Sequence, residues 1–351
     1  MTLRCLQLVP TLPPPVEGVG SYALALAEAL EGQGVSSHFL VGDPAWRADP
    51  PGAAAEVVSE RSARALRRQL AELLPGEGSV LLHYVGYGYA PRGCPFWLVD
   101  GLLDFVRERR DVRLVTLFHE VAASGPPWRS SFWLSPAMRY LAARLARGSH
   151  GLQTSLARYA RLLEGYAPGR SVTLAPVFST VGEPAWVRPL AERAPRLVLF
   201  GGRGARTRAL FDQGKELQAV CEALEIEEIV EIGPPLPALP ATPLRSLGEL
   251  PAREVSAELQ AARVGLLAYP PDYLGKSTIF AAYAAHGLLP VCLGRQGGGE
   301  PRPPFWLPGD SSAPGALQSL ADAARSWYSS HTLPRQAREL ATLLSGGQAP
   351  R

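Results

Sequence analysis

Two patterns alternate along this chain, short apolar runs and longer stretches with helical spacing. Runs such as residues 3–9 and 112–118 have the length and composition of buried strands. Between the runs, apolar side chains recur every three or four residues, which predicts amphipathic helices. Strands that alternate with helices predict a parallel, doubly wound α/β sheet. The predicted strands are residues 3–9, 38–41, 80–83, 112–118, 151–154, 172–175, 197–200, 229–232, 264–269 and 288–293, and the predicted helices are 18–30, 59–74, 96–109, 137–146, 156–163, 215–224, 254–262, 279–286, 316–328 and 335–344.

The alternation stops once and then starts again, which predicts two domains. Residues 178–195 carry several prolines and show no clear period, as is typical of a linker. We expect a first domain over residues 1–178, a linker over 179–195, a second domain over 196–330, and a closing helical segment over 331–351 that can return to the first domain. Two such domains facing each other across a cleft would bind ligands at the carboxyl edges of their sheets.

Composition and charge narrow the class of protein. With 351 residues, of which 46% are hydrophobic and 19% charged, the chain can bury two ordinary cores. A net charge of +3 is too small to indicate a nucleic-acid partner. The four cysteines are scattered without metal-ligand spacing, so we expect a reduced, cytoplasmic protein that binds no metal. There is no signal-peptide pattern and no apolar run of about 18 residues, so we expect no membrane span. Contact with a membrane surface stays open.

Lysine occurs at only two positions, although lysine and arginine together number 35. Lys215 and Lys276 each follow a glycine and open a predicted helix, in GKEL and GKST. Free N–H groups and the helix dipole make such a position attractive to phosphate. We therefore predict that Lys215, and Lys276 with Ser277 and Thr278, bind phosphate, although two lysines in an arginine-biased chain can also arise by chance. GKST does not complete a Walker A loop, because Pro270 stands where that motif needs glycine.

A glycine turn precedes the first predicted helix. Gly18, Gly20 and Ala23 formally match a dinucleotide fingerprint, and Asp43 ends the second predicted strand as a ribose-binding acid would. However, residues 10–17 separate the first strand from Gly18, and a dinucleotide turn is much shorter. The longer loop favours glycines that let the backbone approach a diphosphate. A nicotinamide or flavin enzyme and a purely structural turn remain alternatives.

Aromatic and ionisable side chains follow the third and fourth predicted strands. Tyr84, Tyr87 and Tyr89 alternate with glycines and offer flat faces and hydroxyls that suit a sugar ring, with Arg92 just beyond, so we predict that these four bind the acceptor. A packed tyrosine loop and a solvated arginine are the alternatives.

His119 and Glu120 end the fourth predicted strand, where they could act on an acceptor hydroxyl or a donor sugar, and we predict a catalytic role for both. A structural histidine is the alternative. In the second domain, Arg203 and Arg206 follow the first strand shortly before Lys215 and could neutralise a diphosphate, although a solvated loop would look the same.

Taken together, these residues resemble the GT-B glycosyltransferases, specifically the retaining family-four-like (group 1) branch, over most of the chain. PPPVEGVGSYALALAEALEGQG is similar to that family's opening glycine loop and helix. RLVLFGGRG followed by GKEL resembles its arginine-then-lysine diphosphate site. SLGELPAREVSAELQAARVGLLAYPP resembles the middle of its donor domain, and AAYAAHGLLPV resembles its hallmark helix and following strand.

The resemblance implies two Rossmann-like domains and transfer of a sugar from a nucleotide-diphosphate-sugar co-substrate, with retention and without metal or other cofactor. The second domain would bind the donor and the first an acceptor hydroxyl on a sugar, a lipid-linked molecule or a small molecule. Gly18 and Gly20 would form the phosphate loop, His119 would lie near the sugar, and Arg203 and Lys215 would bind the diphosphate. The resemblance further implies bacterial cell-surface polysaccharide or natural-product glycosylation in the cytoplasm, and leaves peripheral contact with the inner membrane open.

The chain departs from the family pattern at two places. Leu274 and Ala282 stand where the family carries a pair of glutamates, and Arg203 and Lys215 lie twelve residues apart, farther than in the family. We hypothesise that Lys276 and Ser277 take over the binding of the donor phosphate. The alternatives are a catalytically inactive GT-B-like binding protein and a dinucleotide-dependent oxidoreductase.

Overall fold

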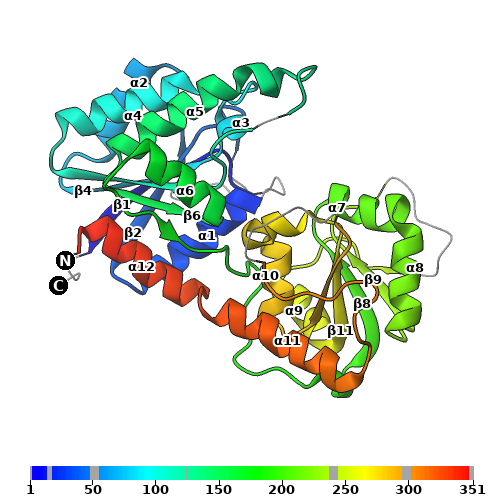
Figure 1. Ribbon diagram of the computed structural model, residues 1–351. Helices are drawn as coiled ribbons and strands as arrows, with labels where there is room; N and C mark the ends of the chain where they lie inside the picture. The colour runs from blue at the N-terminus through cyan, green and yellow to red at the C-terminus, as the bar shows by residue number, and fades with distance from the viewer. Residues whose placement is uncertain are drawn as a thin grey trace. The chain divides into compact units, whose positions relative to one another are not determined.

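The computed structural model describes residues 2–13, 18–47, 55–123, 125–236, 244–294 and 302–347. Its contacts divide the chain into unit 1, which comprises Met1–Pro176 and Leu333–Arg351, and unit 2, which comprises Val177–Thr332 (Figure 1). The expected domain ends at residues 178 and 330 each lie two residues from these divisions. The segment expected as a linker, residues 179–195, belongs to unit 2.

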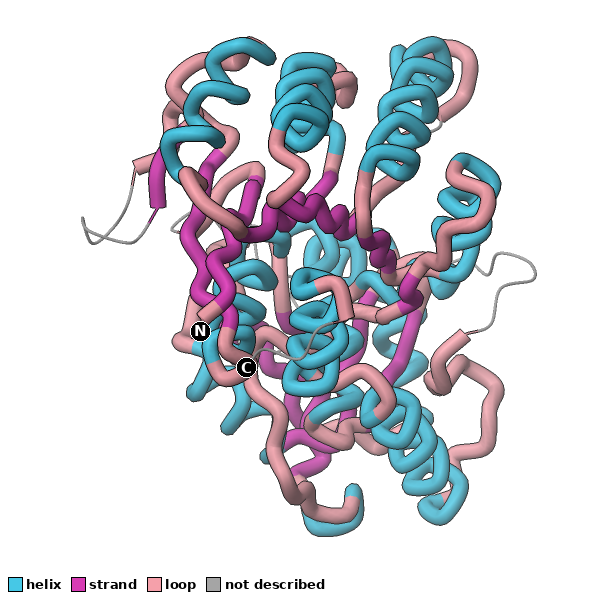
Figure 2. Tube along the Cα trace, turned by 90° about the vertical axis from the view of Figure 1, so that its left-hand side faces the viewer, coloured by secondary structure: helices cyan, strands magenta, loops and turns pink. Residues whose placement is uncertain are grey.

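Unit 1 is built on a seven-stranded sheet in which every pair of neighbouring strands is parallel, in the order β3-β2-β1-β4-β5-β6-β7. Figure 2 shows these strands as a twisted band with helices on both faces. The four central strands are mostly apolar and buried, as strands covered on both faces must be. The strands are β1 (Leu3–Val9), β2 (Val35–Val41), β3 (Ala55–Val57), β4 (Gly78–Tyr84), β5 (Val112–Phe118), β6 (Gly151–Thr154) and β7 (Thr173–Leu174).

Helices cover both faces of this sheet. Figure 1 shows α2 (Ala63–Leu73), α4 (Phe96–Glu108) and α5 (Ser130–Gly148) on one face. On the other face lie α1 (Gly18–Glu31) and α12 (Leu333–Ser345), which pack against each other. Two further helices, α3 (Gly86–Tyr89) and α6 (Ala157–Tyr166), follow β4 and β6.

The return of the chain end to unit 1 depends on buried contacts of α12. This helix packs against β4 and β5, and Ser79 Oγ donates a hydrogen bond to the Leu344 carbonyl at 2.8 Å. Ala337, Leu340 and Leu344 on its inner side are buried. The last helix is therefore part of the first sheet's core, although about 150 residues of unit 2 separate it in sequence.

Unit 2 repeats the architecture on a smaller scale, with a parallel five-stranded sheet in the order β10-β9-β8-β11-β12. Its core is apolar and includes Leu197, Val264, Leu289 and Trp306. The strands are β8 (Ala194–Phe200), β9 (Glu228–Ile232), β10 (Arg245–Ser246), β11 (Ala262–Leu267) and β12 (Leu289–Cys292). The helices are η1 (Leu190–Glu192), α7 (Arg203–Thr207), η2 (Arg208–Asp212), α8 (Gly214–Ala223), α9 (Ala252–Ala261), η3 (Pro271–Lys276), α10 (Thr278–Ala285) and α11 (Pro314–Ser329).

The two doubly wound parallel sheets confirm the fold class expected from the alternating pattern. The largest difference at a helix boundary concerns α5, which begins at Ser130, whereas the pattern placed its start at residue 137. The reason is that Pro136 lies within the helix on its exposed side and is tolerated there, at the cost of one backbone hydrogen bond.

Gly287 ends α10 as the sequence predicted. Its φ of +64° lies in the left-handed region, where side chains other than glycine are strained. A Cβ at this position would also lie 2.8 Å from Val187 Cγ2 and 3.2 Å from the Arg193 guanidinium. Glycine is therefore required both by the turn and by the close packing of the segment before β8.

We expect Gly287→Ala to destabilise unit 2 more than Gly248→Ala. Gly248 has nearly the same φ, +68°, but a Cβ there would meet none of the described residues within 4 Å. The control variant therefore carries only the backbone strain, about 1 kcal/mol, while Gly287→Ala adds the collision. Chemical denaturation of both variants measures the difference, and equal losses would show that the packing around Gly287 relaxes freely.

Candidate active site

A chain of polar side chains crosses the buried centre of the unit 1 sheet. It runs over four neighbouring strands, from Ser37 on β2 through Gln7 on β1 and His83 on β4 to His119, which follows β5. The hydrogen bonds measure 2.8 Å between Ser37 and Gln7, 3.0 Å between Gln7 and His83, and 3.2 Å between His83 and His119. Gln7 and His83 are fully buried, so the chain ends at the half-buried His119.

This network fixes which ring nitrogen of His119 carries a proton. Gln7 Nε2 donates to Ser37 Oγ, so Gln7 Oε1 must accept from His83 Nε2–H. Burial lowers the pKa of His83 to about 3, so the ring is neutral and its Nδ1 is an acceptor. His119 therefore donates from Nε2, which makes Nδ1 the acceptor nitrogen of the neutral His119 ring.

Aromatic packing holds the same ring in place. The rings of His83 and His119 stack at 5.4 Å, and Tyr22 of α1 lies edge-on to His119 at 5.4 Å. The Tyr22 hydroxyl donates to Gln336 Oε1 of α12 at 3.0 Å, and the Gln336 amide donates to the Pro176 carbonyl. Helix α12 thus holds the Tyr22 ring in place against His119.

The structure separates the four predicted acceptor residues into two pairs. Tyr84 and Tyr89 are buried, and the Tyr89 hydroxyl lies 3.0 Å from the Leu8 carbonyl and 3.1 Å from that of His83. These two tyrosines are core residues, which corrects their prediction as acceptor ligands, because the single turn α3 points Tyr89 inward. Tyr87 and Arg92 are exposed, as the prediction requires.

Glu120 lies close to the tyrosine loop. It lines a small cavity with Tyr84 at the end of β4, Tyr87 of α3 and Met138 of α5. The cavity volume of about 10 Å³ is of the order that one water molecule needs, and far below that of a sugar. The cavity therefore does not accommodate an acceptor in this conformation.

The opening glycines occupy different environments. A Cβ at Gly20 would lie 2.7 Å from the Thr11 carbonyl oxygen, so close packing alone requires glycine there. Among the described residues, a Cβ at Gly18 would meet nothing within 4 Å, so close packing with them does not require glycine there. Asp43, the predicted ribose acid of the oxidoreductase alternative, accepts a hydrogen bond from the Ala45 amide at 3.0 Å and caps a local turn.

In unit 2, the predicted arginines also divide into a buried and an exposed one. Arg206 is 1% exposed, forms an ion pair with the equally buried Glu231 of β9, and donates to the Gly201 and Pro234 carbonyls. The buried Glu231 carboxylate neutralises the charge of Arg206 inside the fold. Arg206 is therefore a structural residue, which corrects its prediction as a diphosphate ligand. Arg203, at the start of α7, and Lys215, in the first turn of α8, are exposed to solvent.

The second lysine follows β11, the strand that pairs with β8. Lys276 ends η3 and is half-buried, with its Nζ 5.6 Å from the centre of the Tyr273 ring. Ser277 is the N-cap of α10, and its hydroxyl accepts from the Phe280 amide at 3.2 Å. Thr278 is the first residue of that helix. The expectation that residues 276–278 form a helix N-terminus is confirmed, with Ser277 oxygen already engaged as the cap.

The loops after β8 and β11 contact each other. Arg208 Nε donates to the Ala268 carbonyl at 3.4 Å, and a Cβ at Gly201 would collide with Ile279 in the first turn of α10. Gly201 has a φ of +116°, which only glycine adopts readily. The carboxyl ends of two adjacent strands thus bring the Arg203 segment and the Lys276 turn to one edge of the sheet.

Leu274 and Ala282, which stand where the group 1 glycosyltransferases that the sequence resembles have glutamates, are both buried. Leu274 is 1% exposed and Ala282 is fully buried, so neither position presents a charge at this edge. Within the described parts of the chain, no three His, Cys, Asp or Glu side chains gather in a way that could hold a metal ion. In the same residues, every helix is too short or too polar to cross a membrane.

Sequence reasoning missed several residues of this site. In unit 1, the strand order brings Gln7 and His83 to His119, and Tyr22 of α1 packs against the same ring. In unit 2, the ring of Tyr273 lies near Lys276, three residues later in η3. The one local signal was a polar residue inside an apolar strand, as at Gln7 in LRCLQLV.

Solved structures match the chain over nearly its whole length, while no protein-family model and no curated protein sequence matches it. TarM aligns with a TM-score of 0.58 at 7% identity, covering 99% of this chain and 97% of TarM. An alpha-glucosyltransferase solved with UDP aligns at 0.53 and 11%, covering 99% and 96%. WaaG, a glycosyltransferase involved in lipopolysaccharide biosynthesis, aligns at 0.52 and 12%, covering 98% and 100%. The chain therefore has the GT-B glycosyltransferase fold, as its sequence resemblance implied.

Protonation of buried histidines makes unit 1 sensitive to acid. Folded His83 stays neutral down to about pH 3, while an unfolded histidine binds a proton below its ordinary pKa of 6.5. The stability from this group is therefore complete above about pH 6.5 and falls as the pH is lowered, by about 1.4 kcal/mol per unit. We expect His83→Phe to lose about 2 kcal/mol less than wild type between pH 6.5 and pH 5, as measured by denaturation. An unchanged pH dependence would contradict the neutral assignment.

Substitution of Arg206 is predicted to destabilise the protein much more than substitution of Arg203. Arg206→Ala leaves the Glu231 carboxylate buried without its partner and is expected to cost about 3–5 kcal/mol of unfolding free energy. Arg203→Ala, at an exposed position on the same short helix, is expected to change stability by less than about 0.5 kcal/mol. Urea denaturation compares the two variants directly. If the Arg206 variant were as stable as the Arg203 variant, Arg206 would not be the structural cation described above.

Proposed function

We propose that this protein is a glycosyltransferase that moves a sugar from a nucleotide-diphosphate-sugar donor to an acceptor hydroxyl. Unit 2 binds the nucleoside diphosphate of the donor, and unit 1 carries the acceptor side with His119. The observation that supports this most is a group of three cations, the exposed Arg203 and Lys215 and the half-buried Lys276, in the segments that follow β8 and β11, next to the Ser277-capped helix α10.

The proposed chemistry is mainly electrostatic. When the bond between the sugar and the diphosphate breaks, negative charge grows on the leaving phosphate oxygens. Arg203, Lys215 and Lys276, with the first N–H groups of α10, would stabilise that charge. A site of this kind supplies charge stabilisation from the protein's own cations, so we expect no metal requirement.

His119 is proposed to orient a hydroxyl of the transferred sugar or of the acceptor. Its Nε2–H is directed to His83, so its Nδ1 is the nitrogen that accepts such a hydroxyl proton in a hydrogen bond. The buried chain from Ser37 to His83 and the Tyr22 ring hold the imidazole in one orientation. Retention of configuration, cytoplasmic location and the acceptor class stay predictions from the resemblance.

The inactive GT-B-like protein remains the second candidate function. The observation in its favour is that Leu274 and Ala282 are buried and apolar where the family has glutamates. An oxidoreductase has less support, because Asp43 is bound to the Ala45 amide.

The donor site is tested by titrating UDP, GDP, ADP, dTDP and CDP into the full chain by calorimetry. We expect one nucleoside diphosphate to bind, and Lys215→Ala and Arg203→Ala each to weaken its affinity about tenfold or more, because each removes a charge-assisted hydrogen bond. Arg338→Ala, an exposed arginine on α12 of unit 1, is the control and should bind as wild type does.

Lys276→Ala tests separately whether this lysine compensates for the missing glutamates. A loss of affinity like that of the Lys215 variant is expected, since both lysines are proposed to bind phosphate. Unchanged affinity in the Lys276 variant alone would refute the compensation, and unchanged affinity in all three variants would refute the donor site.

A further inference from the structure

Positive charge is concentrated in one stretch of unit 1. Residues 121–163 contain six arginines and no aspartate or glutamate, whereas the whole chain has a net charge of only +3. Arg139, Arg144 and Arg147 lie on α5, and Arg129 directly precedes it. This stretch is therefore strongly positive, and an excess of acidic residues elsewhere in the chain keeps the net charge low.

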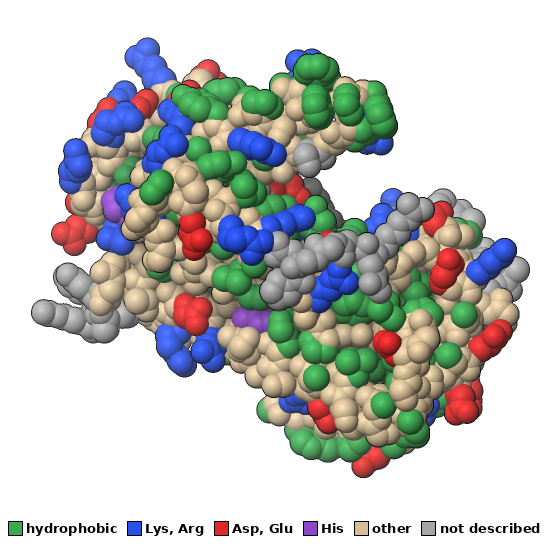
Figure 3. Space-filling view, in the orientation of Figure 1, with side chains coloured by type: hydrophobic (Ala, Val, Ile, Leu, Met, Phe, Trp, Pro, Cys, Tyr) green, Lys and Arg blue, Asp and Glu red, His purple; other side chains and the backbone are tan. Residues whose placement is uncertain are grey.

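The start of α5 carries an exposed aromatic cluster. Trp128 is 83% exposed, Trp133 71% and Phe132 43%. The rings of Phe132 and Trp133 pack edge to face at 5.3 Å, and the Trp133 N–H donates to the Pro127 carbonyl at 2.8 Å. Figure 3 shows hydrophobic side chains gathered at this end of α5, at the top right. Neighbouring tryptophans with this exposure mark a surface that binds a partner.

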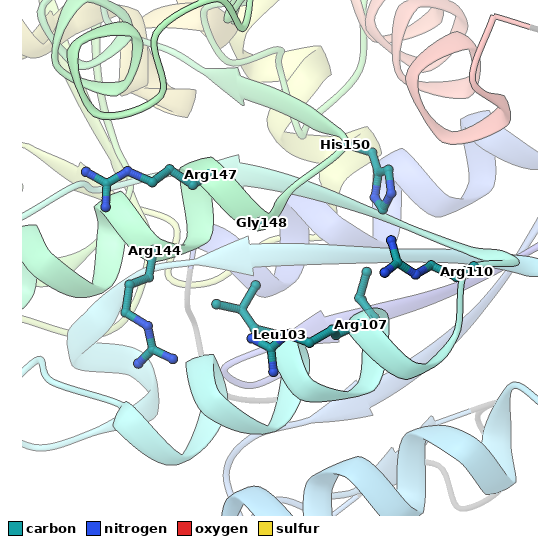
Figure 4. Close-up of a pocket in the computed structure, with 8 residues that line it drawn as sticks. Leu103, Arg107, Arg110, Arg144, Arg147, Gly148 and His150 are labelled. Atoms are coloured by element: carbon teal, nitrogen blue, oxygen red, sulfur yellow. The ribbon is translucent and has the colours of Figure 1, made fainter.

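The other end of α5 borders a basic pocket of about 420 Å³. Its volume is in the range of ligand sites and is sufficient for a phosphate-bearing headgroup. Burial, and after it the charges of Arg113 and Arg170 nearby, lower the pKa of His150 in its wall, while Arg107, Arg110, Arg144 and Arg147 supply the positive charge of the lining itself. Figure 4 shows how the side chains surround the hollow, which is lined by Leu103, Val106, Arg107, Arg110, Arg144, Arg147, Gly148 and His150.

Two nearby acids compensate this charge only in part. Asp104 pairs with Arg107 at 2.6 Å and Asp100 with Arg144 at 2.5 Å, and both lie outside the pocket lining. Arg110 and Arg147 have no acidic partner among the described residues. The pocket thus retains uncompensated positive charge.

The aromatic cluster and the basic pocket lie on the same side of one helix. Exposed or half-exposed residues at positions 132, 133, 136, 140, 144 and 147 recur three or four apart, which places them on one helical face. The Arg144 guanidinium lies 5.6 Å from the centre of the Tyr140 ring and joins the two parts. With 19 residues, α5 is about 28 Å long. We define the α5 surface as Trp128, Arg129, Phe132, Trp133, Arg139, Tyr140, Arg144 and Arg147.

Helix capping alone does not account for this surface. Arg107 and Arg147 lie in the last turns of α4 and α5, where cations favourably meet the helix dipole. That explanation leaves out Arg129 and Arg139, as well as the exposed tryptophans. A free phosphate ligand would account for the pocket but not for the aromatic cluster. A lipid bilayer offers both an anionic headgroup layer and an apolar interior.

We propose that the α5 surface binds the surface of an anionic lipid bilayer. Trp128, Phe132 and Trp133 enter the interfacial region, and the arginines of α5 and of its pocket bind lipid phosphates. Aromatic rings and arginine side chains are the groups that prefer this region of a bilayer. Membrane binding itself does not depend on the proposed glycosyl transfer. Its role does rest on that proposed function, because a protein bound to the bilayer could reach an acceptor held in the membrane.

The test is co-sedimentation of the full chain with vesicles, without donor or acceptor. Vesicles of phosphatidylcholine alone are compared with vesicles that also contain phosphatidylglycerol, at low and at physiological salt. Trp128→Ser with Trp133→Ser forms the aromatic variant, and Arg129→Gln with Arg139→Gln forms the basic variant. The matched controls are Trp186→Ser and Arg253→Gln, at exposed positions of unit 2 outside the α5 surface. Equal melting temperatures establish that the variants fold.

We expect wild type to bind the vesicles that contain phosphatidylglycerol, more strongly at low salt. Both surface variants should weaken that binding about tenfold or more, while the controls bind as wild type does. Absence of vesicle binding by wild type, or an equal loss in the controls, would overturn the proposal. So would intact vesicle binding in an aromatic variant that no longer transfers sugar to a water-soluble acceptor, since the cluster would then be an acceptor site. Nucleoside diphosphate binding is measured separately, so failure of the membrane proposal leaves the donor site standing.

Discussion

Parallel pairing of β4 with β5 is the constraint on which the unit 1 site depends. The register places Tyr84 beside Phe118, so His83 at the end of one strand and His119 just after the other become neighbours. Because His83 is completely buried, it stays neutral and must satisfy both ring nitrogens by hydrogen bonds. Those two bonds tie His119 to Gln7 and so to the centre of the sheet. The half-buried His119 side chain is thus connected by hydrogen bonds to buried residues of the sheet.

At the carboxyl edge of the unit 2 sheet, two neighbouring arginines lie in different environments. Arg206 and Arg203 lie three residues apart, yet the first is enclosed with Glu231 and the second faces solvent. The buried pair joins the end of β8 to β9, which supports the loop that presents the exposed cation. Leu274 and Ala282 are buried and apolar, so no carboxylate at these two positions competes with an anion for the nearby cations. The missing acids thus change the balance of charge in the proposed donor site as well as its hydrogen bonds.

The sequence was sufficient for the fold because each level of pattern agreed. Apolar runs, helical spacing and the left-handed glycine at Gly287 all predicted the doubly wound units that the structure contains. Site residues were harder, since their burial depends on distant partners. Arg206 looked like a ligand because Glu231, its partner, is 25 residues away in sequence and meets it only through strand pairing. Tyr89 was predicted to bind the acceptor, and its burial was missed because the single turn α3 that directs it into the core is too short to show a period.

Turnover of the donor tests the central claim most directly. The full chain is incubated with UDP-, GDP-, ADP-, dTDP- and CDP-sugars without acceptor, and release of the nucleoside diphosphate is followed over time. The account predicts slow release from one class of donor, since glycosyltransferase sites that stabilise a leaving diphosphate also pass the sugar to water at a low rate. A chain that binds a nucleoside diphosphate but releases none from any donor, with or without a panel of sugar acceptors, would contradict it and identify a binding protein with this fold.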